Sequence, residues 1–169
     1  MEQREFEAMA KDIMERADML CLGTRGKEPY PYLRALFNLR NKAQFPGLAG
    51  FFADKGLALY LGTNSSSLKM AQLGADAWVS LYYMIPGEFL GLCLSGRARS
   101  VPEARSELWV EGWERYYPAG PGDPDYSVLR VEPERARGWC GARPFDLALG
   151  AGTGLRALPR LAASSWRRS

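Results

Sequence analysis

A run of hydroxyl and amide side chains followed by a lysine is the strongest chemical signal in this sequence. Residues 63–69 read Thr-Asn-Ser-Ser-Ser-Leu-Lys, after an apolar strand-like run and ahead of a segment with helical spacing. The free N–H groups and the dipole of a helix start favour an anion, and hydroxyl groups with an ammonium would complete a phosphate cradle. The alternative is that Ser65 or Ser66 only caps the helix, while Lys69 points into water.

Arg34 is the second candidate, because it lies within the otherwise apolar segment 31–37, Pro-Tyr-Leu-Arg-Ala-Leu-Phe. A guanidinium among apolar neighbours is costly unless it leaves the core or meets an anion. The alternative is that Arg34 simply points to solvent, as the two-residue period of a strand permits. Taken alone, the segment does not choose between these two interpretations.

The elements that must position these residues are read from hydrophobic spacing. Residues 2–18 have helical spacing with one apolar face, and a short helix is expected over 68–73. Ser100 and Glu103 fit a capping box, which predicts a further helix over 102–117. Strands are expected over 19–24, 30–40, 57–61, 78–85, 89–101 and 127–131. About six strands joined mostly by short turns predict a mainly β antiparallel barrel with peripheral helices.

The composition excludes several classes of site. None of the 169 residues is histidine, which excludes Ser-His-Asp catalysis, His-containing zinc sites and histidine-ligated haem. Cys21, Cys93 and Cys140 are far apart and form no CxxC pair, so no metal site and no disulfide framework are predicted. The cysteine usage, the charged first 18 residues and the lack of a long apolar stretch predict a cytoplasmic protein without integral membrane association.

The net charge of +3 is concentrated at one end. The segment 150–169 contains four arginines and no acid, so the preceding 149 residues carry a net charge of −1. The body therefore lacks the basic face of a nucleic-acid-binding protein. The expected organisation is one domain over residues 1–142 and a basic C-terminal extension over 143–169, in which Leu155, Leu158, Leu161 and Trp166 form an apolar stripe.

The two candidate segments together resemble the pyridoxamine 5'-phosphate oxidase-like, FMN-binding split-barrel superfamily, and within it the general-stress-protein branch. The similarity rests on Arg34-Ala35-Leu36, on the Thr-Asn-x-x-Ser-x-Lys pattern of residues 63–69, and on Leu-Ser-Gly-Arg-Ala at 94–98. It continues through Gly-Asp-Pro-Asp-Tyr at 122–126 and Trp139, and it covers roughly residues 5–140. The resemblance implies a six-stranded antiparallel split β-barrel that binds FMN.

The resemblance also implies roles for particular residues. Arg34, Thr63, Ser67 and Lys69 would hold the phosphate and ribityl chain of FMN, while Ala35 and Leu36 would lie along the isoalloxazine ring. Asn64 and Leu68 belong to the same cofactor-binding set. In this family the flavin lies at the interface of a homodimer, so Trp139 or Trp109 would approach from the partner subunit. No residue is assigned a catalytic role.

Departures from the family pattern bear on the substrate. True pyridoxamine phosphate oxidases carry Ser-Arg-Lys in the phosphate loop, where this chain has Ser67-Leu68-Lys69, and their early lysine is replaced by Leu39. Their C-terminal Arg-x-His cannot exist without histidine. These differences argue against pyridoxamine phosphate as substrate. The function expected is a flavin-dependent oxidoreductase acting on an unidentified small molecule, and the alternative is a non-catalytic flavin or deazaflavin sensor in stress response.

Two other motifs are weaker. Residues 150–154, Gly-Ala-Gly-Thr-Gly, imitate a dinucleotide-binding loop, but no acidic residue follows Asp146 to complete that fingerprint. Asp123 and Asp125 lie in a loop rich in proline and glycine, where turn formation explains the carboxylates better than catalysis does.

Overall fold

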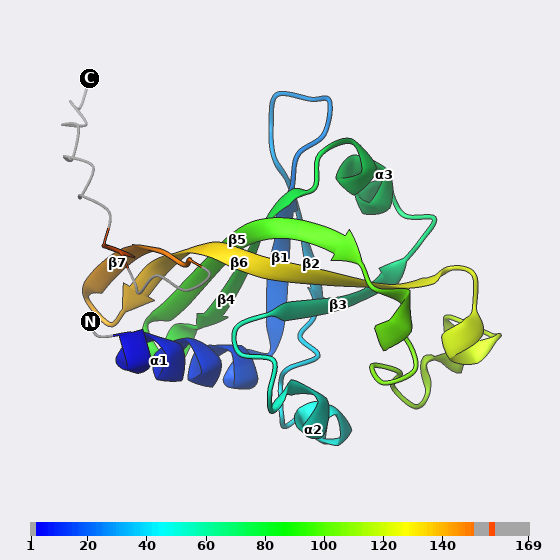
Figure 1. Ribbon diagram of the computed structural model, residues 1–169, viewed down its shortest axis with the longest axis horizontal. Helices are drawn as coiled ribbons and strands as arrows, with labels where there is room; N and C mark the ends of the chain where they lie inside the picture. Colours follow the sequence, from blue (N-terminus) through cyan, green and yellow to red (C-terminus); the bar gives the residue numbers. More distant parts are fainter. Residues whose placement is uncertain (1–2, 151–155, 158–169) are drawn as a thin grey trace.

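The computed structural model describes residues 3–150 and 156–157, and one antiparallel sheet organises this part of the chain (Figure 1). The helices are α1 (Gln3–Arg16), α2 (Ala49–Phe52) and α3 (Leu68–Ala75). The strands are β1 (Met19–Thr24), β2 (Tyr32–Phe37), β3 (Leu59–Asn64), β4 (Trp78–Ile85), β5 (Leu90–Ser100), β6 (Tyr126–Cys140), β7 (Arg143–Ala148) and β8 (Arg156–Ala157). β1–β6 form the antiparallel split barrel that the sequence predicts, so the fold class is confirmed.

The sheet has an open seam, and its strand order explains why. Hydrogen-bonded neighbours follow the order β2-β1-β4-β5-β6-β7-β8, while β3 branches off by pairing with β6. Along one edge of β6 lies β5, and the other edge is shared end to end by β3, at residues 126–131, and β7, at residues 135–140. The curl of the sheet brings β2 close to β3, but these two strands are not hydrogen-bonded neighbours.

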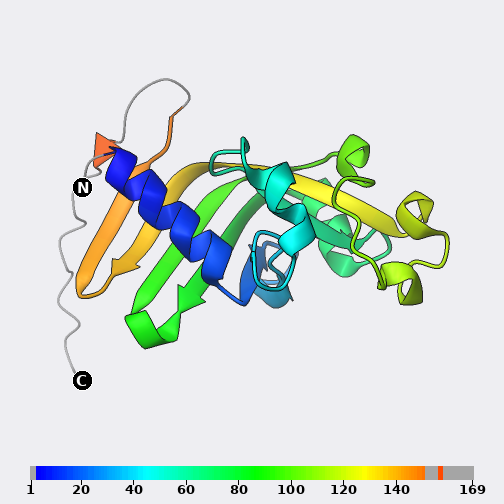
Figure 2. The same ribbon diagram turned by 90° about the horizontal axis from the view of Figure 1, so that it is seen from below.

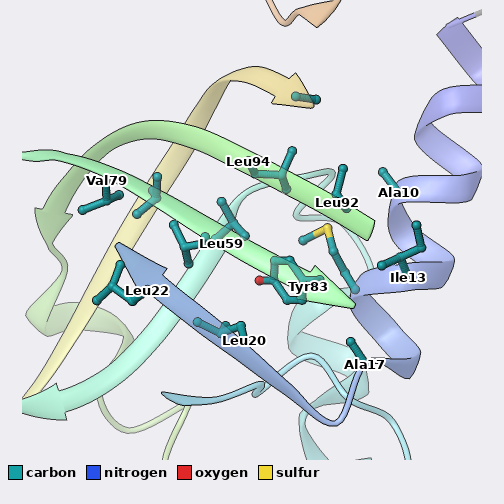
Figure 3. Close-up of a cluster of buried hydrophobic side chains, with 14 of the residues drawn as sticks. Ala10, Ile13, Ala17, Leu20, Leu22, Leu59, Val79, Tyr83, Leu92 and Leu94 are labelled. Carbon is teal, nitrogen blue, oxygen red and sulfur yellow. The ribbon is translucent and has the colours of Figure 1, made fainter. Parts of the chain in front are cut away.

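The main core lies between α1 and the concave face of the sheet. Phe6, Ala10, Ile13 and Met14 are all buried, and their spacing places them on one face of α1. Figure 2 shows α1 running across the strands, and Figure 3 shows Ala10 and Ile13 beside Leu92 and Tyr83. Burial of this apolar stripe is the main force that fixes the helix on the sheet.

A second apolar cluster forms where the sequence predicted a helix over 102–117, and that prediction is wrong. Only the short 3-10 turns Pro102–Ala104 and Trp113–Arg115 form there, and no side-chain capping bond starts the first. Gly112 has φ +89°, a left-handed conformation that interrupts the helical path between the two turns. Instead of lining one face of a helix, Leu108, Trp113 and Tyr117 pack against Tyr126 of β6.

β6 is longer than the predicted strand 127–131, because it continues through the charged segment to Cys140. Pro133, which has no backbone N–H to donate, lies opposite a register shift at Ser95 and Gly96 of β5, where a bulge tolerates it. Beyond Cys140, the segment assigned to a C-terminal extension begins with β7, which pairs with β6. The predicted apolar stripe of that extension lies outside the described residues, and so does most of the 150–154 glycine motif.

Among the helices formed by residues 3–150, none has both the length and the apolar character needed to cross a membrane.

Candidate functional site

A cavity of about 790 Å³ opens at the seam between β2 and β3. Three parts of the chain line it: the first contributes Asp18, Met19, Ala35, Leu36, Phe37 and Gln44, the second Gly62, Thr63, Asn64 and Lys69, and the third Trp113, Arg115, Tyr116 and Tyr117. The first two parts meet because the barrel leaves β2 and β3 unpaired where they approach. Ala35 and Leu36 of the first candidate segment and Thr63, Asn64 and Lys69 of the second therefore line the same cavity.

The seam explains why segments far apart in the sequence act together. Ala35 and Leu36 come from β2, whereas Thr63 and Asn64 end β3 and lead into α3, which carries Lys69 in its first turn. Figure 1 shows α3 directly beyond the end of β3, beside the connection between β1 and β2. The structure therefore brings the two segments singled out in the sequence to one cavity.

Arg34 lies at this end of the barrel and is held in a fixed position. Its Nη1 donates a hydrogen bond to Thr24 Oγ1 at 2.6 Å, and its Nη2 donates to Gln72 Oε1 at 3.1 Å. Burial lowers the pKa of the guanidinium, although Arg34 stays charged at any physiological pH. The side chain of Arg34 therefore does not simply point to solvent, because its guanidinium is hydrogen-bonded to Thr24 and Gln72.

Lys69 is close enough to Arg34 for the two charges to repel each other. Burial, and then the charge of Arg34, lower the pKa of the Lys69 ammonium, while Asp125 acts in the opposite direction. Within residues 3–150, neither cation forms an ion pair with a carboxylate. Two neighbouring cations without an anionic partner favour the binding of an anion between them.

The loop between β3 and α3 supplies hydroxyl groups and a helix start. Ser67 is the N-cap residue of α3, but its side chain makes no capping bond, and its hydroxyl donates to the Asn64 carbonyl at 2.7 Å. The interpretation that Ser65 or Ser66 caps the helix is therefore wrong. Thr63 Oγ1 is buried and has no hydrogen-bond partner, which is costly unless a ligand supplies one.

Asp125 is a part of the site that the sequence interpretation missed. Its carboxylate accepts hydrogen bonds from Asn64 Nδ2 at 2.8 Å and from the Ser66 N–H at 2.7 Å, and these bonds lower its pKa. Asp123 behaves as expected of a turn residue, since it accepts from the N–H groups of Ala119 and Asp125. The Gly-Asp-Pro-Asp segment was the available signal, but only the pairing of β3 with β6 reveals what Asp125 holds.

The third wall of the cavity was also missed, because its residues were assigned to a helix. Trp113 stacks on Phe37 with ring centroids 6.1 Å apart, and Tyr117 donates to Asn64 Oδ1 at 3.3 Å. A side chain at Gly62 would place its Cβ 3.2 Å from two ring atoms of Trp113. The absence of a side chain at Gly62 therefore lets the indole lie close to β3 and leaves room in the cavity.

Four of the predicted site residues do not line the cavity itself: Arg34, Ser67, Leu68 and Trp139. Leu68 is exposed at the start of α3. Trp139 is half exposed and lies near the end of β6, opposite Gly91, thirteen positions along the strand from Tyr126, which pairs with Asn64. Trp109 packs against Trp113 and Tyr126 in the second core cluster.

The residues present fit a phosphate monoester. Arg34 and Lys69 offer positive charge without an ion-pair partner, Thr63 offers an unpartnered hydroxyl, and α3 begins beside them. The rest of the cavity is large and has an aromatic wall, as a planar ring system requires. The fold and this cavity define a split-barrel protein with a cavity at its seam, near which two cations lie without an ion-pair partner among the described residues.

Comparison with known proteins agrees with that class. Residues 6–140 match the family described as Pyridoxamine 5'-phosphate oxidase, and the chain belongs to this family. No curated protein matches the sequence.

Solved structures share the fold. A protein from Clostridium acetobutylicum related to general stress protein 26 has 25% identity and a TM-score of 0.69, over 86% of this chain and 95% of that one. A pyridoxamine 5'-phosphate oxidase-related, FMN binding protein from Nostoc punctiforme has 13% identity and a TM-score of 0.60, over 92% of this chain and 94% of that one. A heme binding protein from Mycobacterium smegmatis has 18% identity and a TM-score of 0.62, over 84% of this chain and 57% of that one.

Proposed function

We propose that this chain binds FMN in the seam cavity, with the phosphate held by Arg34, Thr63, Ser67 and Lys69. The observation that carries the proposal is the pair of half-buried cations, Arg34 and Lys69, beside the unpartnered hydroxyl of Thr63. Ala35 and Leu36 would then lie along the ring, and Asn64 would keep the loop in place. The FMN binding protein from Nostoc punctiforme, which has the same fold, supports this choice of ligand.

The second part of the proposal is a homodimer with the flavin at its interface. Strand register places several exposed apolar side chains on one outward face of the sheet: Met19, Leu33, Phe37, Tyr82, Met84 and Trp139. Contiguous apolar patches of this kind mark interaction surfaces. Met19 and Phe37 also line the cavity, so a second copy on this face would border the flavin. Trp139, which lies on the same face, would reach the cavity only from the partner subunit.

The proposed activity is that of an oxidoreductase acting on a small molecule. When bound, FMN supplies the transfer of a hydride or of electrons, and the protein orients it and limits access to it. In this chain, the Arg34 and Lys69 charges bind the phosphate, while Phe37 and Trp113 shape the apolar part of the cavity. The heme binding neighbour does not favour haem here, because a chain without histidine cannot supply the usual proximal ligand.

The test is a visible absorption spectrum of the purified protein, followed by anaerobic reduction and mixing with oxygen or quinones. Bound FMN that is reoxidised by an added acceptor supports the oxidoreductase. Tightly bound flavin that reduces no acceptor supports a sensor or flavin-storage role, and a spectrum shifted to that of a deazaflavin identifies the other ligand. A colourless protein that cannot be loaded with either flavin contradicts all of these functions.

A further inference from the structure

Three polar side chains form a closed hydrogen-bonded triangle behind the cationic end of the cavity. Thr24 Oγ1 donates to Gln72 Oε1 at 2.7 Å, and the guanidinium of Arg34 donates to both of these oxygens. Thr24 is 2% exposed and Gln72 is 7% exposed. Neither residue lines the seam cavity, and neither is in the proposed phosphate-binding set of Arg34, Thr63, Ser67 and Lys69.

The chemistry of the triangle leaves the charge of Arg34 intact. Both of its acceptors are neutral oxygens, so they orient the guanidinium without neutralising it, as a carboxylate would do. A guanidinium has five N–H donors, and the triangle uses one on each terminal nitrogen. The remaining donors are free to bind an anion with fixed geometry.

The triangle also connects the two elements that carry the cations. Thr24 ends β1, Arg34 lies on the neighbouring strand β2, and Gln72 lies on α3 one turn after Lys69. The side chain of Gln72 therefore ties the helix of Lys69 to the strand of Arg34. Through Gln72, the guanidinium of Arg34 is hydrogen-bonded to the helix that carries Lys69.

We infer that Thr24 and Gln72 are positioning residues that set the Arg34 guanidinium for a phosphate monoester, and that they thereby select a phosphorylated flavin over its dephosphorylated form. This inference rests on the proposed function. The competing account is that the triangle only satisfies buried polar groups at the end of the core. In that account, its loss weakens the whole fold and affects every ligand alike.

The experiment measures the affinities of the full chain for FMN and for riboflavin, which has the same ring system without the phosphate. Thr24→Val and Gln72→Met remove the hydrogen-bonding groups at similar size, and Thr24→Ser is the matched control that keeps the hydroxyl. Gln72→Glu keeps the acceptor but adds a charge that neutralises Arg34. We expect Thr24→Val and Gln72→Met to weaken FMN about tenfold, the scale of one oriented hydrogen bond to a charged group, with riboflavin unchanged.

A double-mutant cycle separates positioning from folding. In an Arg34→Ala background, Gln72→Met should cause no further loss of FMN affinity, because the group that it positions is gone. Gln72→Glu should lower FMN affinity through its charge and leave riboflavin affinity unchanged. Where Gln72→Met folds poorly, the same cycle with Thr24→Val in place of Gln72→Met decides the question.

Equal losses for FMN and riboflavin, or the same loss with and without Arg34, would overturn the positioning role. A wild-type chain that binds FMN no better than riboflavin would instead overturn the proposed phosphate site, and this inference with it.

Discussion

Asp125, the residue just before β6, holds Asn64 at the end of β3 in place: its carboxylate accepts a hydrogen bond from Asn64 Nδ2 at 2.8 Å. A second bond, from the Ser66 N–H at 2.7 Å, ties the following turn to the same carboxylate. Because β3 pairs with β6, the residue just before β6 faces the loop just after β3. The geometry of the proposed phosphate loop therefore depends on a residue about sixty positions further along the chain.

Asp125→Ala should weaken FMN binding by up to about 30-fold, because two hydrogen bonds that order the loop are lost, each contributing roughly 1 kcal/mol. Isothermal titration with FMN measures this loss. Glu134→Ala is the matched control, since it removes an exposed carboxylate further along β6. Wild-type affinity in Asp125→Ala would show that the loop keeps its shape without this carboxylate.

The affinity for FMN should fall at alkaline pH because of Lys69. In the free protein, burial and Arg34 lower the pKa of this ammonium, whereas a bound phosphate would raise it again. FMN binding then takes up a proton once Lys69 begins to deprotonate. Affinity should be constant below the pKa of the free protein and fall as the pH rises through it.

Lys69→Arg is the control for this pH dependence, because a guanidinium stays charged throughout the range. Fluorescence titrations of FMN and riboflavin across alkaline pH provide the measurement. If Lys69→Arg loses FMN affinity with the same pH profile as the wild type, another group is responsible.

Gly62→Ala should narrow the cavity, because the new Cβ would lie 3.2 Å from the ring of Trp113. The indole must shift, at a cost of about 1–3 kcal/mol in stability, and flavin affinity should fall with it. Thermal unfolding and FMN titration measure the two effects. Gly74→Ala is the control: its Cβ would meet nothing within 4 Å, and alanine in α3 should raise stability by about 0.5–1 kcal/mol. Equal flavin affinity in both variants would contradict the packing argument.

Leu33→Glu should dissociate the proposed homodimer. Leu33 is 69% exposed on β2, within the outward apolar face, and a carboxylate buried there would have no partner. Light scattering should give the mass of a dimer for the wild type and of a monomer for the variant, and the monomer should lose flavin affinity. Glu134→Ala again serves as the control. A wild-type protein that is a monomer and binds FMN tightly would contradict the proposed homodimer.

Much of the sheet could be predicted from the sequence, because apolar alternation and turn residues fix local structure directly. These patterns predict the strand that contains Arg34 and the loop that leads to Lys69, and the structure brings both segments to the seam. The error over residues 102–117 has a physical cause. The prediction rested on the local capping-box pattern of Ser100 and Glu103, whereas Trp113 and Tyr117 pack into a tertiary cluster around Tyr126 that a local pattern does not reveal.

The supporting residues were harder to predict, because their roles depend on partners far away in the chain. Thr24, Gln72 and Asp125 are ordinary polar residues in the sequence, and each acquires its role through a hydrogen bond across the fold. The proposed contact of Trp139 with the flavin requires a second subunit, and it stays a prediction.

The most direct test of the account is the affinity of the purified protein for FMN with and without Ser67 and Lys69. The wild type should bind FMN, and the double variant Ser67→Ala, Lys69→Ala should lose about 2–4 kcal/mol of binding free energy, roughly 30- to 1,000-fold. Riboflavin affinity should change little. Unchanged FMN affinity in the double variant would contradict the phosphate site at the seam of the barrel.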